Sequence, residues 1–228
     1  MKKIAIAIDG PAASGKSTTA KLVAQALGYL HIDTGAMYRA LTLKALDEKI
    51  DLNDRNEVVS LAQQSKIQLE NSDGELKVMV DGSDVTKRIR TQPVTRSVST
   101  VSSYAGVRDE MVREQQKMAA RGGVVLEGRD IGTVVLPNAE LKIFMSASVD
   151  ERAKRRKKDL AHGGVEANED ELKKEIELRD QMDSTREASP LRKAPDAVEL
   201  DTSHLTIEEQ VHFILERAEK LIRGKESS

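Results

Sequence analysis

The sequence predicts an α/β fold in which a parallel sheet carries helices on both faces. Short apolar runs alternate along the chain with longer stretches of helical periodicity. The first apolar run leads directly into a glycine-rich loop and then into a helical pattern. Such an alternation is typical of parallel sheets, because a crossover helix must return the chain to the edge where the next strand begins. One segment departs from the alternation and predicts a small inserted α+β subdomain.

The expected strands of the sheet are Ile4–Ile8, Tyr29–Ile32, Gly123–Leu126, Leu141–Met145 and Ala197–Leu200. A helical pattern follows the glycine-rich loop and separates the first two of them. Gly28 is expected to end this helix, because glycine readily adopts the left-handed conformation that closes a helix. The amphipathic stretch from about Ile207 to Ile222 predicts a last helix that packs on the sheet.

Residues 63–100 interrupt the alternation and form the predicted insertion. Ile67–Asn71 and Glu75–Asp81 are apolar-alternating runs joined by Ser72-Asp73-Gly74. An Asp-Gly pair between two such runs predicts a β-hairpin, because both residues tolerate the positive φ angles of a tight turn. A helix-like stretch, Val85–Arg90, follows.

The rest of the chain, residues 1–62 and 101–228, is expected to form one core. Arginines and lysines crowd residues 152–158, and Gly163-Gly164 follows them. This pattern predicts a charged helix that leads into a mobile loop. We therefore expect a short lid at about residues 150–168 of the core.

Composition excludes several classes of protein. The chain has 228 residues, 39% hydrophobic content, a net charge of −2, 2% aromatic residues and no cysteine. There is thus no bulk attraction to nucleic acid or to an anionic membrane, no aromatic platform for single strands, and no disulfide framework. No apolar run approaches the length of a membrane span. We expect a cytoplasmic monomer with neither nucleic acid nor membrane as partner.

The glycine-rich loop satisfies the pattern G-x-x-x-x-G-K-[ST] of a phosphate-binding loop, here called the P-loop. Its residues are Gly10, Pro11, Ala12, Ala13, Ser14, Gly15, Lys16 and Ser17. Small residues let backbone N–H groups wrap closely around a triphosphate, and the following helix directs its positive end at the phosphates. Lys16 would bridge the β- and γ-phosphates of ATP, and Ser17 would be a ligand of Mg²⁺. Thr18 could share that metal role.

Arginines accompany short acidic motifs at three further places. These are Asp33-Thr34-Gly35 with Arg39, Glu127-Gly128-Arg129-Asp130 after an expected strand, and the trio Arg179, Asp183 and Arg186. The trio is spaced i, i+4, i+7 and is expected to share one helix face. Ligands of parallel sheets bind beyond the carboxyl ends of strands, where the first two motifs would lie. The motifs predict a site for a second anion.

The absence of other motifs narrows the reaction. A guanine-reading Asn-Lys-x-Asp segment and a Leu-Ser-Gly-Gly signature are both missing, which argues against a regulatory GTPase and an ABC-type ATPase. No general base is evident, and none of the four histidines is given a role. An acceptor that is itself a phosphate monoester would need none, because its oxygens are already anionic nucleophiles. Arginine and Mg²⁺ would then carry the chemistry.

Over essentially its whole length the chain resembles bacterial cytidylate kinases, a family of P-loop nucleoside monophosphate kinases. The resemblance rests on Ile8-Asp9-Gly10-Pro11, Asp33–Arg39, Gly128–Val135, Arg179-Asp180 and Ser189-Pro190-Leu191. It implies the Mg²⁺-dependent reaction ATP + (d)CMP → ADP + (d)CDP in pyrimidine nucleotide metabolism. It also implies a kinase core, a monophosphate-binding insertion at 63–100 and a lid at 150–168.

The resemblance further implies individual roles. Arg39, Arg129 and Arg186 would bind the acceptor phosphate, and Lys16, Arg129, Arg186, Arg155 and Arg156 would stabilise the transferring phosphoryl group. Among the lid arginines the choice between Arg152, Arg155 and Arg156 stays open. Glu127 could support the waters of Mg²⁺.

Cytosine would be read by Ser99, Arg108 and Asp130, and the sugar would be held by Thr34, Arg179 and Asp183. A carboxylate accepts a hydrogen bond from the amino group of cytosine and repels the carbonyl of uracil. Ser97, Ser102 and Ser103 crowd Ser99, so the exact serine stays open. So does the preference between CMP and dCMP.

Two other interpretations compete. One is a different small-molecule kinase on the same core, although the Asp-Gly-Phe-Pro-Arg segment of adenylate kinases is absent. The other is a nucleotide-dependent switch or an RNA-binding ATPase, which the near-neutral charge and the few aromatic residues disfavour.

Overall fold

The computed structural model describes residues 2–72, 75–162 and 164–224. The chain forms two compact units. Met1–His31 and Ala119–Ser228 make the first, and Ile32–Met118 make the second. The predicted insertion at 63–100 falls inside the second unit, and its separate role stays a prediction.

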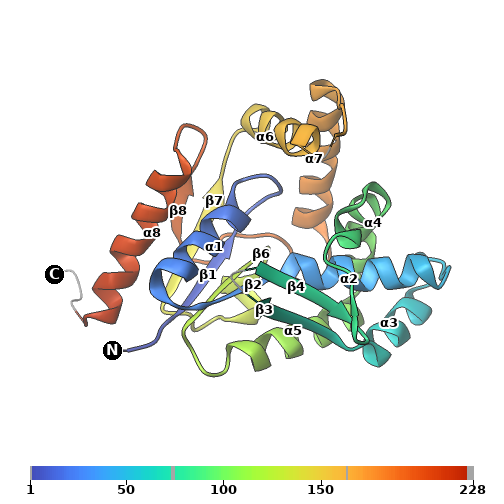
Figure 1. The fold of residues 1–228 in the computed structure, drawn as a ribbon, viewed down its shortest axis with the longest axis horizontal. Coiled ribbons are helices and arrows are strands. Elements are labelled where there is room, and N and C mark those ends of the chain that lie inside the picture. Colours follow the sequence, from blue (N-terminus) through green and yellow to red (C-terminus); the bar gives the residue numbers. More distant parts are fainter. Residues whose placement is uncertain (1, 73–74, 163, 225–228) are drawn as a thin grey trace. The chain divides into compact units, whose positions relative to one another are not determined.

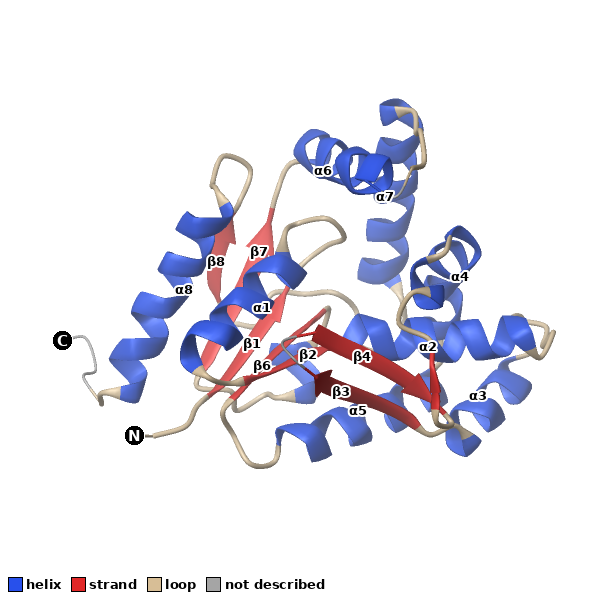
Figure 2. Ribbon diagram, viewed as in Figure 1, coloured by secondary structure: helices blue, strands red, loops and turns tan. Residues whose placement is uncertain are grey.

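The central sheet has the strand order β2-β6-β1-β7-β8 (Figures 1 and 2). Its strands are β1 (Ala5–Asp9), β2 (Leu30–Asp33), β6 (Val124–Gly128), β7 (Leu141–Ser146) and β8 (Val198–Asp201). β1 pairs in parallel with β6 and β7, and β7 pairs in parallel with β8. The predicted mainly parallel sheet is thereby confirmed, and each expected strand lies within one or two residues of its predicted bounds.

One face of the sheet is covered by α1 (Lys16–Leu27) and α8 (Ile207–Ile222). Ile6 and Ile8 of β1 share a buried core with Val23 of α1 and Ile214 of α8. The other face of β1 carries Asp9, which receives backbone hydrogen bonds from the short π-helical turn η2 (Ile131–Val135). Apolar residues on both faces are expected for a parallel sheet that helices cover on each side.

The predicted ends of helices α1 and α8 are confirmed. Gly15 precedes α1 with φ 93°, and Gly28 closes it with φ 64°, as glycines at a left-handed cap do. α8 begins with a capping box between Thr206 and Glu209 and covers the predicted range.

The predicted lid contains α6 (Val149–His162), which packs on α7 (Glu169–Thr185). Ala153, Leu172 and Ile176 form a small buried core between the two helices. Of the predicted Gly163-Gly164 loop, Gly163 lies outside the described residues.

The second unit contains α2 (Thr34–Asp47), α3 (Arg55–Gln64), η1 (Arg88–Arg90), α4 (Gln92–Ser103), all but the last residue of α5 (Ala105–Ala119), and a small sheet. In that sheet β3 (Ile67–Ser72) pairs antiparallel with β4 (Glu75–Val80), and β4 pairs with β5 (Ser83–Asp84). The predicted hairpin is confirmed, and its turn residues 73–74 lie outside the described residues. The helix-like stretch Val85–Arg90 was wrong in extent, because only Arg88–Arg90 form a single 3₁₀ turn.

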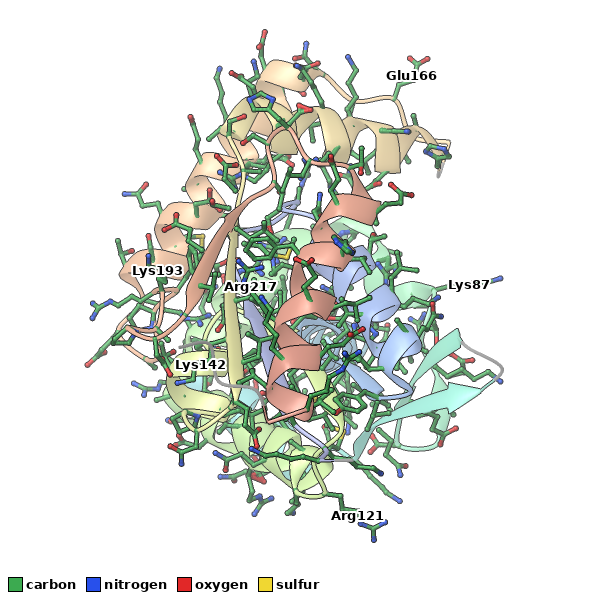
Figure 3. All side chains as sticks on the ribbon, turned by 90° about the vertical axis from the view of Figure 1, so that its left-hand side faces the viewer. Lys87, Arg121, Lys142, Glu166, Lys193 and Arg217 are labelled. Carbon is green, nitrogen blue, oxygen red and sulfur yellow. The ribbon has the colours of Figure 1, made fainter. Side chains whose placement is uncertain are left out.

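Charged side chains cover the exterior. Figure 3 shows Lys87, Glu166 and Lys193 pointing away from the ribbon, and all three are exposed. Within the described part of the chain, none of the helices combines the length and apolarity that a membrane span requires.

Candidate active site

The P-loop joins β1 to α1 and is shaped by close backbone approaches. A Cβ atom on Gly10 would lie 2.0 Å from the backbone oxygen of Met145, so only glycine fits there. Ala13 has φ 58°, and Gly15 has φ 93°. These left-handed residues curl the loop so that successive N–H groups can converge on one anion.

Lys16 is folded back onto this loop. Its Nζ donates to the Pro11 oxygen at 2.6 Å and to Ser14 Oγ at 3.3 Å, and the residue is 5% exposed. Burial, helped by the charge of Arg129 and opposed by the carboxylates Glu127 and Asp9, lowers the pKa of Lys16 to about 7. The ammonium group is thus poorly compensated until an anion joins it.

A chain of three polar side chains lies beside the start of α1. Ser17 Oγ donates to Glu127 Oε2 at 2.6 Å, and His31 Nε2 lies 3.1 Å from Glu127 Oε1. A hydroxyl and a carboxylate are the oxygen donors that Mg²⁺ prefers, and Mg²⁺ usually takes only one or two protein ligands beside the phosphates. The residues therefore fit Mg²⁺. Sequence reasoning gave His31 no role, because a histidine within a strand pattern carries no signal of its partner.

The two residues directly after β6, Arg129 and Asp130, each pair with an oppositely charged side chain. Arg129 Nε donates to Asp183 Oδ2 at 2.8 Å, and Arg186 Nη2 lies 3.7 Å from Asp130 Oδ1. Asp130 and Asp183 are each 4% exposed. Opposite charges alternate in this cluster, which we call the acceptor cluster (Arg129, Asp130, Asp183 and Arg186).

Within the acceptor cluster, Arg129 and Asp183 hold each other in the ionised state. Burial alone would raise the pKa of Asp183, but the charges of Arg129 and Arg179 keep that pKa below its ordinary value. Burial alone would lower the pKa of Arg129, but the charge of Asp183 and their hydrogen bond keep it above its ordinary value. An anion would thus meet fixed, fully charged guanidinium groups.

The prediction that Arg179, Asp183 and Arg186 share one helix face was wrong for Arg186. Helix α7 ends at Thr185, and Arg186 has ψ 144°, which is not helical. Its Nε and Nη2 donate to the Ser189 oxygen at 2.8 and 2.6 Å. Arg186 therefore approaches Asp130 from the segment after the helix, while Arg179 and Asp183 lie on α7 as expected.

Two of the lid arginines reach the backbone of the P-loop. Arg152 is buried, forms an ion pair with Asp180 at 2.6 Å and donates to the Ala12 oxygen at 3.4 Å. Arg155 donates to the Ser14 oxygen at 3.3 Å and to Thr202 Oγ1 at 3.0 Å. Arg156 is half-buried on the same helix. Arg152 and Arg155 are thus the two lid candidates that reach the P-loop, and the choice among the three arginines stays open.

In the second unit Asp33 organises the start of α2. It caps the helix by accepting from the Ala36 N–H at 2.9 Å, and its Oδ2 forms an ion pair with Arg39 Nη2 at 2.8 Å. Thr34 is buried as the first residue of α2. The buried Nε of Arg39 has no hydrogen-bond partner among the described residues, so this arginine keeps a donor for an anion.

The predicted base-reading residues of this unit lie on α4 and α5. Arg108 is 3% exposed, donates to the Ser102 oxygen at 3.2 Å, and stacks 5.3 Å from the ring centre of Tyr38. Ser99 is buried, and its carbonyl accepts from Ser102 Oγ at 3.2 Å. Ser99 and Arg108 are thus linked through Ser102, which keeps the exact serine open.

The first strand of the parallel sheet enters a phosphate-binding loop, and a cationic cluster lies at the end of the neighbouring strand. This combination defines a P-loop kinase of the small-molecule type. Solved structures agree with this fold. A protein from Eubacterium ventriosum (15% identity, TM-score 0.51) covers 96% of this chain and 99% of its own, and shikimate kinase from Bacteroides thetaiotaomicron (13%, TM-score 0.50) covers 97% and 99%.

The family follows from closer relatives. The family model described as cytidylate kinase matches residues 6–220. The chain is 54% identical to the cytidylate kinase of Bacillus licheniformis, over 96% of this chain and 97% of that protein. It is 52% identical to that of Bacillus subtilis (97% and 99%) and 55% identical to that of Geobacillus sp. (93% and 95%). The chain belongs to the cytidylate kinase family, as its motifs predicted.

Proposed function

We propose that this protein transfers the γ-phosphoryl group of ATP to CMP or dCMP, giving CDP or dCDP, as a cytoplasmic monomer in pyrimidine nucleotide metabolism. Family membership supports the reaction. The structural observation that carries it is the acceptor cluster, in which Arg129 and Arg186 lie within 2.8 and 3.7 Å of carboxylates in the same unit as the P-loop. A second anion and a polar base both find partners there.

The donor nucleotide would bind on the P-loop. The backbone N–H groups of Gly10–Ser17 and the ammonium group of Lys16 would hold the β- and γ-phosphates, and Ser17 with Glu127 would hold Mg²⁺. When bound, Mg²⁺ neutralises charge on the β- and γ-oxygens. Lys16 would exchange its bond to the Pro11 oxygen, 2.6 Å long, for a phosphate oxygen.

The acceptor phosphate would bind Arg39, Arg129 and Arg186. One of its oxygens forms the new bond to the γ-phosphorus while the bond from that phosphorus to the β–γ bridging oxygen breaks. No base has to remove a proton, since the attacking oxygen is anionic. The arginines and Lys16 therefore act by holding two anions in line and by stabilising the charge of the transferring group, with Arg155, Arg156 or Arg152 contributing from the lid.

Base selection would rest on buried hydrogen bonds. Asp130 would accept from the amino group of cytosine, with Arg108 and Ser99 at the ring, and Thr34, Arg179 and Asp183 would hold the sugar. A uracil carbonyl facing the Asp130 carboxylate would leave both groups unsatisfied, and buried unpaired polar groups are costly.

The test is a coupled ADP-release assay with CMP, dCMP, UMP and AMP as acceptors. We expect the two cytosine nucleotides to give the highest kcat/KM. A kcat/KM for AMP equal to or above that for CMP would overturn the proposal. Omitting Mg²⁺ should abolish turnover with every acceptor.

A further inference from the structure

Asp9 links the P-loop strand to the segment that carries two members of the acceptor cluster, Arg129 and Asp130. It is the last residue of β1 and is 4% exposed. Its Oδ1 accepts from the N–H of Ile131 at 2.7 Å, and its Oδ2 accepts from the N–H of Gly132 at 2.8 Å. Two successive peptide groups directly after Asp130 are therefore fixed by one side chain that immediately precedes the P-loop.

The segment after Asp130 is also held from the side of β7. A Cβ atom on Gly132 would lie 3.4 Å from Asp9 Oδ2 and 3.1 Å from Cδ of Lys142. Lys142, labelled beside the sheet in Figure 3, donates to the Pro137 oxygen at 2.6 Å. A side chain at position 132 would thus press on Lys142 and come into contact with Asp9, so glycine fits here best.

Holding a backbone segment with a buried carboxylate costs free energy, because burial disfavours the charged form. Burial raises the pKa of Asp9 to about 6, the two N–H bonds favour its ionised form, and the charge of Asp130 disfavours it. An asparagine would fill a similar volume without a buried charge, but with a single acceptor oxygen it could not accept each N–H group on an oxygen of its own. What a carboxylate adds is simultaneous control of both peptide planes.

We propose that Asp9 is a positioning residue for phosphoryl transfer, which orients Arg129 and Asp130 relative to the P-loop through the backbone of Ile131 and Gly132. The inference rests on the proposed function, because it assigns Arg129 and Asp130 to the acceptor nucleotide. A displacement of about 1 Å in such a group is enough to cost about 10²-fold in rate. Asp9 itself touches neither nucleotide in this role.

The test is Asp9→Asn, which preserves volume but turns an NH₂ group toward one of the two N–H donors. We expect kcat/KM for CMP to fall about 10- to 100-fold, with a raised KM for CMP. The Kd of a non-hydrolysable ATP analogue, measured without acceptor, should stay within about three-fold. The matched control is Asp54→Asn, because Asp54 also accepts from two backbone N–H groups, those of Asn56 and Glu57, both at 3.0 Å, at the start of α3. It should leave both nucleotides unaffected.

A second variant, Gly132→Ala, keeps Asp9 and presses on the same backbone. It should raise the KM for CMP a few-fold without weakening the ATP analogue, and it decides the matter if Asp9→Asn fails to fold. Parental CMP kinetics in both variants would overturn the inference. So would an equal loss of affinity for CMP and the ATP analogue, which indicates general loosening of the fold. Failure of the proposed function would show separately, as absent CMP turnover in the parent protein.

Discussion

Binding of ATP should draw a proton onto Lys16. In the structure the Lys16 ammonium is 5% exposed and its nearest partners are a carbonyl and a hydroxyl, so burial lowers its pKa to about 7. A triphosphate with its Mg²⁺ still carries net negative charge, and its contact with Lys16 should restore the ordinary pKa. The free protein is therefore partly deprotonated at Lys16 at neutral pH, while the complex is protonated.

The magnitude follows from the pKa. With a pKa of about 7, Lys16 is about half protonated at pH 7 and about one-tenth protonated at pH 8. Binding should thus take up about 0.5 proton at pH 7 and about 0.9 proton at pH 8. The terminal phosphate of the nucleotide has lost its own last proton by pH 8, because its pKa is about 6. Isothermal titration calorimetry in buffers of different ionisation enthalpy measures the uptake as the slope of the observed enthalpy.

Lys16→Arg is the control, since a guanidinium stays charged at every accessible pH. Its uptake at pH 8 should be near zero, even though its affinity for the nucleotide falls. An uptake below about 0.2 proton at pH 8 in the parent protein would refute the reasoning. Lys16 would then already be charged in the free protein, and the assigned cost of its burial would be wrong.

Two further predictions concern the acceptor base and the metal. Asp130→Ala should lower kcat/KM for CMP by about 10²-fold or more, roughly 3 kcal/mol, because the cytosine amino group loses its acceptor; a value within two-fold of the parent would remove Asp130 from base reading. Glu127→Gln should raise the Mg²⁺ concentration needed for half-maximal turnover several-fold. The neutral amide attracts the cation less than the carboxylate does, and it weakens the 2.6 Å hydrogen bond from Ser17. Mn²⁺ titration followed by electron paramagnetic resonance measures the same change in the presence of a non-hydrolysable ATP analogue, and an unchanged metal affinity would contradict it.

The features that could be predicted from the sequence are those with a local cause. Apolar runs marked the strands to within one or two residues, most clearly for the central strands β1 and β6, which are buried on both faces. Gly15 and Gly28 marked the ends of α1, because the left-handed conformation there is a property of single residues. The P-loop was found for the same reason, since its pattern encodes the geometry of one short turn.

What could not be predicted depends on residues far apart in the chain. The bonds from Ile131 and Gly132 to Asp9 join residues more than 120 positions apart, so no local pattern announces them. The helical spacing of Arg186 was misleading, because a spacing rule does not say where the helix ends, and α7 ends one residue earlier. Arg186 pairs with Asp130 only because the segment after α7 brings it there, and no local pattern predicts that path.

The acceptor cluster couples recognition of the base and the sugar to binding of the acceptor phosphate. The carboxylates proposed to read cytosine and to hold the sugar, Asp130 and Asp183, are the same ones that lie 3.7 Å from Arg186 and 2.8 Å from Arg129. In the free protein they hold the arginines in place, which lowers the entropy that is lost when an anion binds.

This coupling has a consequence for specificity. A cytosine amino group or a sugar hydroxyl that donates to one of these carboxylates reduces the pull of that carboxylate on its arginine, so the arginine interacts more strongly with the acceptor phosphate. A nucleotide that lacks the donor leaves the carboxylate fully engaged with Arg129 or Arg186. Discrimination against the wrong acceptor should therefore appear in kcat as well as in KM, because the misread nucleotide also meets weaker stabilisation of the charge that develops during transfer.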